Sequence, residues 1–195
     1  MQLSDLDLSK TYSYADYLQW NFEERLELIK GKIFKMTPAP NLFHQELSVI
    51  ITGELYSYLK GKPCRVFSAP FDVRLSRKSD STEEKKIYTV VQPDVCVVCD
   101  PTKLDSKGCT GAPDIAVEIL SPGNNQKELR NKYEVYEESG VKEYWIISPQ
   151  DESFLKYTLI EGSYQPSRLM TIGDIITTPI LPGFELSLET VFAGI

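Results

Sequence analysis

The segment 114–120, DIAVEIL, constrains the fold more than any other part of the sequence. It is mostly apolar on both faces, which is typical of a central strand that is covered on both sides. A predicted helix follows at about residues 126–139, where Gly140 ends it, and the strand-like segment 143–147 comes directly after. A strand, a helix and a strand in this order predict a right-handed crossover between two parallel strands.

The preceding segments extend this unit into a mixed α/β core. Apolar residues at helical spacing predict a helix over residues 41–60, with Asn41 as its N-cap and Gly61 just after its end. Strand-like patterns follow at residues 65–67, 71–75, 87–91 and 94–98. Ala69-Pro70 leaves open whether the first two form one bent strand or two. Polar loops are predicted at residues 76–86 and 100–112, so residues 41–148 are predicted to form a helix, three strands, a helix and a strand.

Shorter elements are predicted on both sides of this core. Residues 26–29 and 33–36 flank Lys30-Gly31-Lys32 and predict a hairpin, because Gly31 can adopt a positive φ. Short helices are predicted at 13–20 and 188–192, and strands at 155–160 and 167–171. The length of 195 residues matches one domain, so residues 1–195 are predicted to form a single α/β domain with a mixed sheet flanked by helices.

Charge and hydropathy narrow the possible partners. The net charge of −7 argues against non-specific coating of nucleic acid, which depends on basic surface. There is no 18-residue apolar run for a membrane-spanning helix, and the start, MQLSDLD, lacks the basic and apolar regions of a signal peptide. We therefore expect a cytoplasmic protein that does not associate with membranes and has no disulfides.

Four cysteines are present, two of them as Cys96-Val97-Val98-Cys99. A structural zinc site usually needs two such pairs, and this sequence has only one. The pair lies in a predicted strand, where residues i and i+3 point to opposite faces. We therefore predict buried structural cysteines that bind no zinc.

Three ionisable residues lie in or beside predicted elements that are otherwise apolar. Glu118 lies in the predicted central strand, where a carboxylate is unfavourable unless it is paired or binds a metal. Lys132 falls within or beside the sheet-facing stripe of the helix 126–139, and Asp94 follows Pro93 at the start of a strand. Each also has an ordinary explanation. Glu118 could form an ion pair or lie at a strand end, Lys132 could snorkel or pair with Glu128, and Asp94 could belong to a turn.

Taken together, the three residues suggest metal-dependent hydrolysis. Two carboxylates on neighbouring strands can hold a divalent cation, and a nearby lysine can orient water or stabilise a phosphate. Asp114 is the alternative acid, but four residues along a strand place it roughly 13 Å from Glu118, so it is expected to anchor the strand or its loop. His44 is the only histidine, no Gly-rich phosphate loop is present, and we expect no small organic cofactor.

These motifs together resemble a known family. The order of elements, Pro93-Asp94 and Glu118 are similar to the PD-(D/E)XK nuclease superfamily. The segment 27–33, the segment 113–122 and the segment 140–146 resemble the bacterial "putative restriction endonuclease" family, long catalogued as a domain of unknown function. The resemblance covers roughly residues 12–190. It implies a restriction-endonuclease-like fold and magnesium-dependent phosphodiester cleavage.

The sequence departs from the superfamily motif at one position. The motif lysine is expected two residues after Glu118, where this chain has Leu120. The resemblance implies that the lysine has moved to the following helix, as Lys132. It also implies accessory roles in the cleft for Glu27 and His44, and for Glu128 where the family tends to have Asp.

We therefore expect an endonuclease that hydrolyses DNA. Asp94 and Glu118 are expected to hold Mg²⁺ or Mn²⁺, close enough for one ion to bridge them, and Lys132 to position the nucleophile or stabilise the phosphate. The Ile119 carbonyl could add a ligand. A homodimer is expected, because cutting two strands needs two sites. The alternative from another class is an inactive nuclease fold that serves as a nucleic-acid or protein interaction module.

Overall fold

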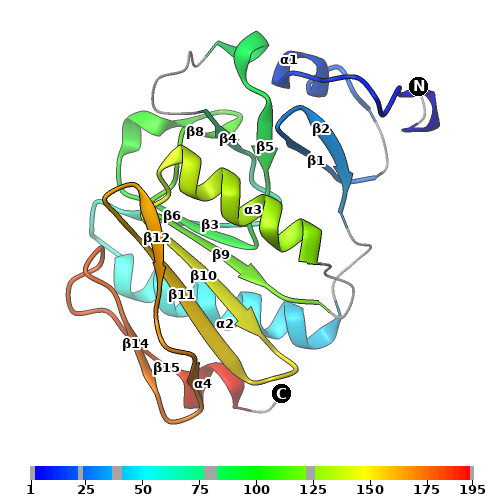
Figure 1. Ribbon diagram of the computed structural model, residues 1–195. Coiled ribbons are helices and arrows are strands. Elements are labelled where there is room, and N and C mark those ends of the chain that lie inside the picture. Colours follow the sequence, from blue (N-terminus) through cyan, green and yellow to red (C-terminus); the bar gives the residue numbers. More distant parts are fainter. Residues whose placement is uncertain (1–2, 22–23, 37–40, 77–82, 122–125, 194–195) are drawn as a thin grey trace.

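A computed structural model of the chain describes residues 3–21, 24–36, 41–76, 83–121 and 126–193 (Figure 1), with only the backbone at residues 4 and 126–128. Within these ranges no helix is both long and apolar enough to span a membrane.

The larger sheet has seven strands. Their order is β12–β11–β10–β9–β6–β3, with β13 also paired to β11. The strands span Arg65–Ser68 (β3), Val95–Val98 (β6), Ile115–Ile119 (β9), Glu143–Ser148 (β10), Ser153–Ile160 (β11), Ser163–Pro166 (β12) and Met170–Thr171 (β13). The pair β9–β10 is parallel and α3 (Gln126–Ser139) connects its strands, which confirms the predicted crossover.

Two helices cover the opposite faces of this sheet (Figure 1). Leu47, Ile51 and Leu55 of α2 (Leu42–Leu59) pack against the odd-numbered residues of β9 and of its neighbours. The even-numbered Ala116 shares a second cluster with Tyr136 of α3. Because side chains alternate along a strand, Glu118 also faces α3.

A second sheet lies on the α3 side. Its order is β2–β1–β5–β4–β8–β7. The strands span Leu26–Ile29 (β1), Lys32–Lys35 (β2), Val73–Leu75 (β4), Thr89–Val91 (β5), Leu104–Asp105 (β7) and Gly108–Thr110 (β8). Buried residues of β4 and β5 pack in one cluster with Ala116 of β9 and Val135 of α3.

This sheet decides one question that the sequence left open and corrects one prediction. The segment 65–75 forms two strands that belong to different sheets, β3 and β4. The predicted loop 100–112 contains the short helix η3 (Pro101–Lys103) and the hairpin β7–β8. The hairpin was not predicted because the segment is rich in polar residues. Gly108 of β8 has φ 126° and lies so close to the Asp72 carbonyl that a Cβ atom would clash. In the other predicted loop, residues 77–82 lie outside the described ranges and η2 spans Glu84–Lys86.

The flanking elements follow the predictions in part. The hairpin β1–β2 turns through Lys30 and Gly31, both at positive φ, so the turn is one residue shorter than predicted. The first helix, α1, spans only Tyr14–Tyr17 after a 3-10 turn at Leu3–Asp5 (η1). At the C-terminal end, β14 (Ile175–Thr177) pairs with β15 (Glu185–Ser187), and α4 spans Leu188–Phe192 as predicted. The predicted strand at 167–171 is reduced to β13, while β12, β14 and β15 were not predicted.

The expectation that the chain has no disulfide is wrong in this structure, because Cys64 is bonded to Cys99. In the register of β3 and β6, Arg65 lies opposite Val98, so the residues just beyond, Cys64 and Cys99, face each other. This cross-strand pairing could not be predicted from a cysteine count. The predicted orientation of the CxxC pair is confirmed, since Cys96 packs in the cluster on the α3 side and Cys99 against the cluster on the α2 side.

Candidate metal-dependent hydrolytic site

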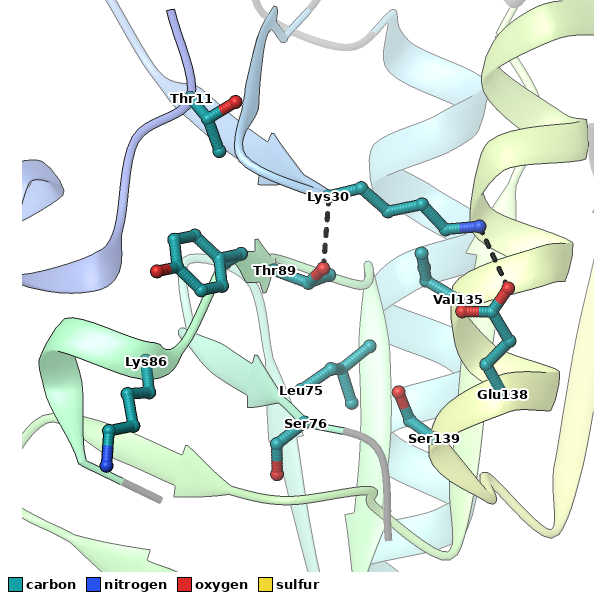
Figure 2. Close-up of a pocket in the computed structure, with 10 residues that line it drawn as sticks. Thr11, Lys30, Leu75, Ser76, Lys86, Thr89, Val135, Glu138 and Ser139 are labelled. Carbon is teal, nitrogen blue, oxygen red and sulfur yellow. Dashed lines mark hydrogen bonds and ion pairs between the residues drawn. The ribbon is translucent and has the colours of Figure 1, made fainter. Parts of the chain in front are cut away.

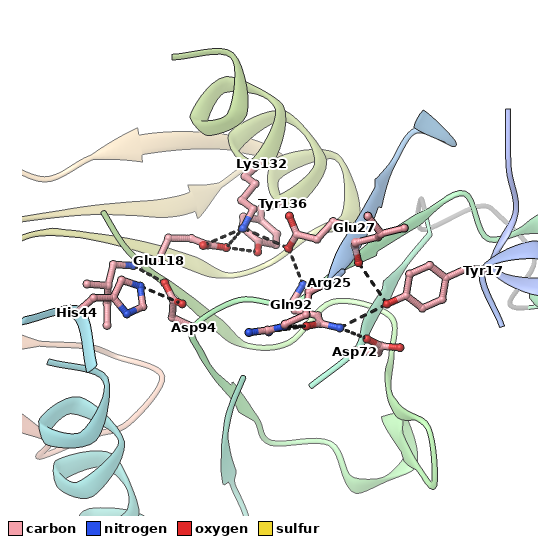
Figure 3. A network of polar contacts seen from close by, with 12 residues as sticks. Tyr17, Arg25, Glu27, His44, Asp72, Gln92, Asp94, Glu118, Lys132 and Tyr136 are labelled. Atoms are coloured by element: carbon pink, nitrogen blue, oxygen red, sulfur yellow. Dashed lines mark hydrogen bonds and ion pairs between the residues drawn. The ribbon is translucent and has the colours of Figure 1, made fainter. Parts of the chain in front are cut away.

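Glu118 and Lys132 are brought together across the interface between β9 and α3 (Figure 3). Lys132 Nζ donates to both oxygens of Glu118 at 2.9 Å, and Tyr136 Oη donates to Glu118 Oε1 at 2.8 Å. Lys132 and Tyr136 are four residues apart and therefore share one helix face. Glu118 and Lys132 are only 8% and 4% exposed, so this ion pair lies inside the protein and Lys132 does not snorkel to solvent.

Glu27 of β1 completes the environment of Lys132. Its Oε1 lies 3.3 Å from Lys132 Nζ and accepts the backbone N–H of Gln92 at 2.7 Å. The lysine therefore lies between two buried carboxylates from different sheets. The structure thus brings Glu27, one of the predicted accessory residues, to the site.

Asp94 directly precedes β6, the strand that pairs with β9, which carries Glu118. In the register of β6 and β9, Val95 lies opposite Val117, so the residue before Val95 and the residue after Val117 also face each other. Residues directly opposite each other have Cβ atoms roughly 5 Å apart. The Asp94 carboxylate is fixed at both oxygens, because Oδ2 accepts the Ile119 N–H at 2.8 Å and Oδ1 lies 3.3 Å from His44 Nε2 of α2.

The acids outnumber the bases at this site. Three carboxylates, from Asp94, Glu118 and Glu27, surround one lysine, which gives −3 + 1 = −2 if all four groups are charged and His44 is neutral. Burial raises the pKa of Glu118, and the negative charges of Asp94 and Glu27 raise it further against the opposing effect of Lys132. Burial alone would lower the pKa of Lys132, but the carboxylates outweigh it and hold that pKa well above its usual value. The lysine therefore stays charged, and the excess negative charge favours a bound proton or cation.

The oxygens at the site suit a hard divalent cation. Mg²⁺ is usually held by one or two carboxylates, with water completing its shell. A carboxylate oxygen can accept about two hydrogen bonds, so Glu118 Oε2 and both Asp94 oxygens retain capacity beside the partners above. Among the described residues, no group of three or more His, Cys, Asp or Glu side chains is arranged to hold a metal ion. An ion at this site could use these two carboxylates together with backbone carbonyl or water oxygens.

Some residues of the site were not predicted from the sequence. Tyr136 was read only as part of the apolar stripe, although its spacing from Lys132 could have indicated a shared target. A polar chain also leads away from Glu27 (Figure 3): Arg25 Nη2 donates to Gln92 Oε1 at 2.6 Å, and Gln92 Nε2 donates to Asp72 Oδ1 at 2.8 Å. No sequence spacing links these residues, since they come from different strands and loops.

The remaining candidates are Asp114 and Glu128. Asp114 accepts the Cys99 N–H at 2.7 Å and Lys142 Nζ at 2.6 Å, which confirms that it anchors the loop after β6. Glu128 lies in α3, but its side chain is outside the described part of the chain.

The fold and family place the protein among nuclease-like proteins. The structure is similar to a crystal structure described as "a putative nuclease belonging to DUF820" from Anabaena variabilis, with a TM-score of 0.73, 19% identity and coverage of 93% of this chain and 97% of that one. This likeness defines a restriction-endonuclease-like fold, as predicted. Residues 14–189 match the family model of Uma2, "Putative restriction endonuclease". The chain therefore belongs to the Uma2 family, which confirms the family resemblance.

A relative among curated sequences carries less information. An uncharacterized protein of a Synechocystis strain is 26% identical over 139 residues, which cover 70% of this chain and 68% of that protein.

Proposed function

We propose that the protein is an endonuclease that hydrolyses phosphodiester bonds of DNA with the help of Mg²⁺ or Mn²⁺. The observation that carries this proposal is the buried contact between Lys132 and Glu118, next to Asp94 on the neighbouring strand. In the superfamily motif, a lysine on the strand lies beside the acids. The strand position is Leu120 in this chain, and Lys132 of α3 lies beside the acids instead.

Each residue has a distinct role in this proposal. Asp94 and Glu118 would hold the cation, with the Ile119 carbonyl as an additional oxygen. When bound, a divalent ion lowers the pKa of water and offsets charge on the phosphate. Tyr136 and Lys132 fix the orientation of the Glu118 carboxylate through three hydrogen bonds. Burial and the charge of Glu118 raise the pKa of Tyr136, so its hydroxyl stays a donor.

Lys132 must exchange one contact to act on the substrate. Its ammonium has three N–H donors. Two point to Glu118 and the third lies toward Glu27. Donation to a phosphate oxygen or to the attacking water would therefore replace one of these contacts. A cation at Glu118 would favour that exchange by competing with the ammonium for the same carboxylate.

One observation favours a second candidate, a nuclease fold that binds nucleic acid or protein without cutting. Glu118 already receives three hydrogen bonds, and a closed ion pair of this kind is stable without a metal. The net charge of −7 points the same way. Metal binding separates the two candidates, because only the enzyme needs the cation.

The discriminating experiment is a thermal melt with and without Mn²⁺. An ion bound only to the folded state stabilises it by about 2.7 kcal/mol at 100 times its Kd. We expect a rise in Tm for the wild type and little or none for Asp94→Asn, with the exposed Glu54→Gln as the control that keeps the wild-type shift. No Mn²⁺-dependent shift in the wild type would favour the interaction module.

We also propose a homodimer for double-strand cleavage, which sedimentation of the intact protein would test.

A further inference from the structure

A second feature beside the candidate site is a groove along α2. It has a volume of about 430 Å³, and its lining includes Asp94, His44 and Arg25. Most of its lining comes from a single face of α2, and Ser68 and Ala69 at the end of β3 also line it. Pockets that hold small organic groups measure about 300–1,000 Å³. The groove therefore has room for a group the size of one nucleotide, not for a duplex.

Gly53 lies in this groove, in the interior of the 18-residue helix α2. Glycine in a helix interior is less stable than alanine. A Cβ atom at this position would meet nothing within 4 Å, so no contact within the described part of the chain requires glycine. The missing side chain leaves open space only on the outside of the helix. A ligand that approaches α2 at Gly53 would explain this space.

The groove also offers specific contacts. Val49, Gly53 and Tyr56 follow helical spacing along one stripe of α2, and Val49 and Tyr56 are large apolar side chains that are 70% and 62% exposed. An exposed tyrosine provides a face on which a base can stack. Thr52 Oγ1 and His44 Nδ1 are buried and have no hydrogen-bond partner among the described residues, although both side chains line the groove.

Arg25 supplies the positive charge in the lining of the groove. Its Nε and Nη2 donate to Gln92 Oε1, and a guanidinium group carries five N–H donors in all. Donors therefore remain for a phosphate oxygen. No other lining residue of the groove is a lysine or arginine. One cation fits a single backbone phosphate better than the continuous basic surface that a duplex needs.

We propose that this groove binds an unpaired nucleotide of the DNA strand, next to the phosphodiester that is cut at Asp94 and Glu118. The base would stack on Tyr56 above the space at Gly53, and the phosphate would contact Arg25. This inference rests on the proposed function and adds that the substrate strand is unpaired where it passes α2.

A second pocket provides a control (Figure 2). It measures about 350 Å³ and lies between α3 and the smaller sheet. Its Lys30 is engaged by Glu134 and Glu138, at 3.2 and 2.9 Å. Its lining includes Tyr88, which is 44% exposed and therefore a matched tyrosine away from α2.

The test measures binding of a labelled single-stranded oligodeoxynucleotide by fluorescence anisotropy without divalent metal, and KM for cleavage with metal. Gly53→Leu fills the groove and Tyr56→Ala removes the stacking face, so each should raise Kd about tenfold. Both should raise KM more than they lower kcat. Gly53→Ala should raise Tm by about 2–4 °C, which shows that the helix tolerates a side chain there. The controls Ser57→Leu, on α2 outside the groove, and Tyr88→Ala should leave Kd unchanged.

The outcomes distinguish the groove proposal from the nuclease proposal. If the wild type cleaves DNA and Gly53→Leu has the same Kd and KM, the groove proposal is wrong and the nuclease proposal stands. If the wild type cleaves no DNA with any metal but Gly53→Leu still weakens oligonucleotide binding, the groove stands as a binding site and the nuclease proposal fails. Absence of single-strand binding by the wild type overturns the groove proposal.

Discussion

Lys132 Nζ lies 2.9 Å from both carboxylate oxygens of Glu118 and 3.3 Å from Glu27 Oε1. One ammonium group thus joins α3 to β9 and β1, so it connects the two sheets at the candidate site. The same lysine therefore contributes to folding as well as to the proposed chemistry, and variants must separate the two.

Lys132→Met should lower the free energy of unfolding by about 3–5 kcal/mol, because it leaves two buried carboxylates without a cation. The double variant Lys132→Met with Glu118→Gln should lose less than the sum of the two single variants, since it removes one of the stranded charges. Urea unfolding of the three variants and the wild type measures this coupling. Additive losses would contradict the buried ion pair.

Tyr136→Phe should have a smaller effect. It removes one hydrogen bond to Glu118 Oε1 and should lower the free energy of unfolding by about 1–3 kcal/mol. It should also slow cleavage about tenfold, because the carboxylate is held less rigidly. Tyr133→Phe on the same helix is the control, since Tyr133 contacts Glu137 and not the site. Equal rates for the two variants would exclude an orienting role for Tyr136.

The ion pair between Arg74 and Asp105 predicts a pH dependence of stability away from the site. Arg74 lies 2.6 Å from Asp105 and lowers the pKa of its carboxyl below the usual 3.8. A depressed pKa contributes stability that is present above 3.8 and is lost as pH falls through the folded-state pKa. Asp105→Asn should therefore lower the free energy of unfolding by about 1 kcal/mol at pH 7, a small effect because the carboxylate is exposed. The loss should be smaller below pH 3. Urea unfolding at both pH values checks this, and an equal cost at each would refute it.

The Cys64–Cys99 disulfide closes a loop of 35 residues in sequence separation. Such a bond should contribute about 3–4 kcal/mol under oxidising conditions. Cys64→Ser should therefore lower the free energy of unfolding by a similar amount without reductant, and much less with it. Alkylation of the unreduced protein in denaturant, followed by mass spectrometry, should label only Cys96 and Cys109. Four labelled thiols would show that the bond does not form in solution.

The sequence predicted the parts of the fold that depend on local patterns. The helix at 126–139 and the strands on either side of it were recognisable from apolar spacing and Gly140, and the structure reproduces that helix residue for residue. The hairpin β7–β8 was missed because its strands are only two and three residues long. Strands this short have no measurable alternation, and tertiary contacts determine them.

The site was predictable to the same extent. An acid in a central strand and a lysine on a sheet-facing helix position are unfavourable alone, so each suggested a partner. The register that sets Asp94 opposite Glu118, and the approach of Glu27 and Tyr136, are non-local. They arise from pairing between strands that are far apart in the sequence, which one sequence does not reveal.

The most direct test of the proposed function is cleavage of a supercoiled plasmid by the wild type and by Glu118→Gln, with Mg²⁺, Mn²⁺ or EDTA. The substitution keeps the size of the side chain and removes the charge that would hold the ion. We expect metal-dependent nicking by the wild type and by the control Glu54→Gln, none with EDTA, and a rate at least about 100-fold lower for Glu118→Gln. No cleavage by the wild type with any metal, or equal cleavage by Glu118→Gln, would contradict the account.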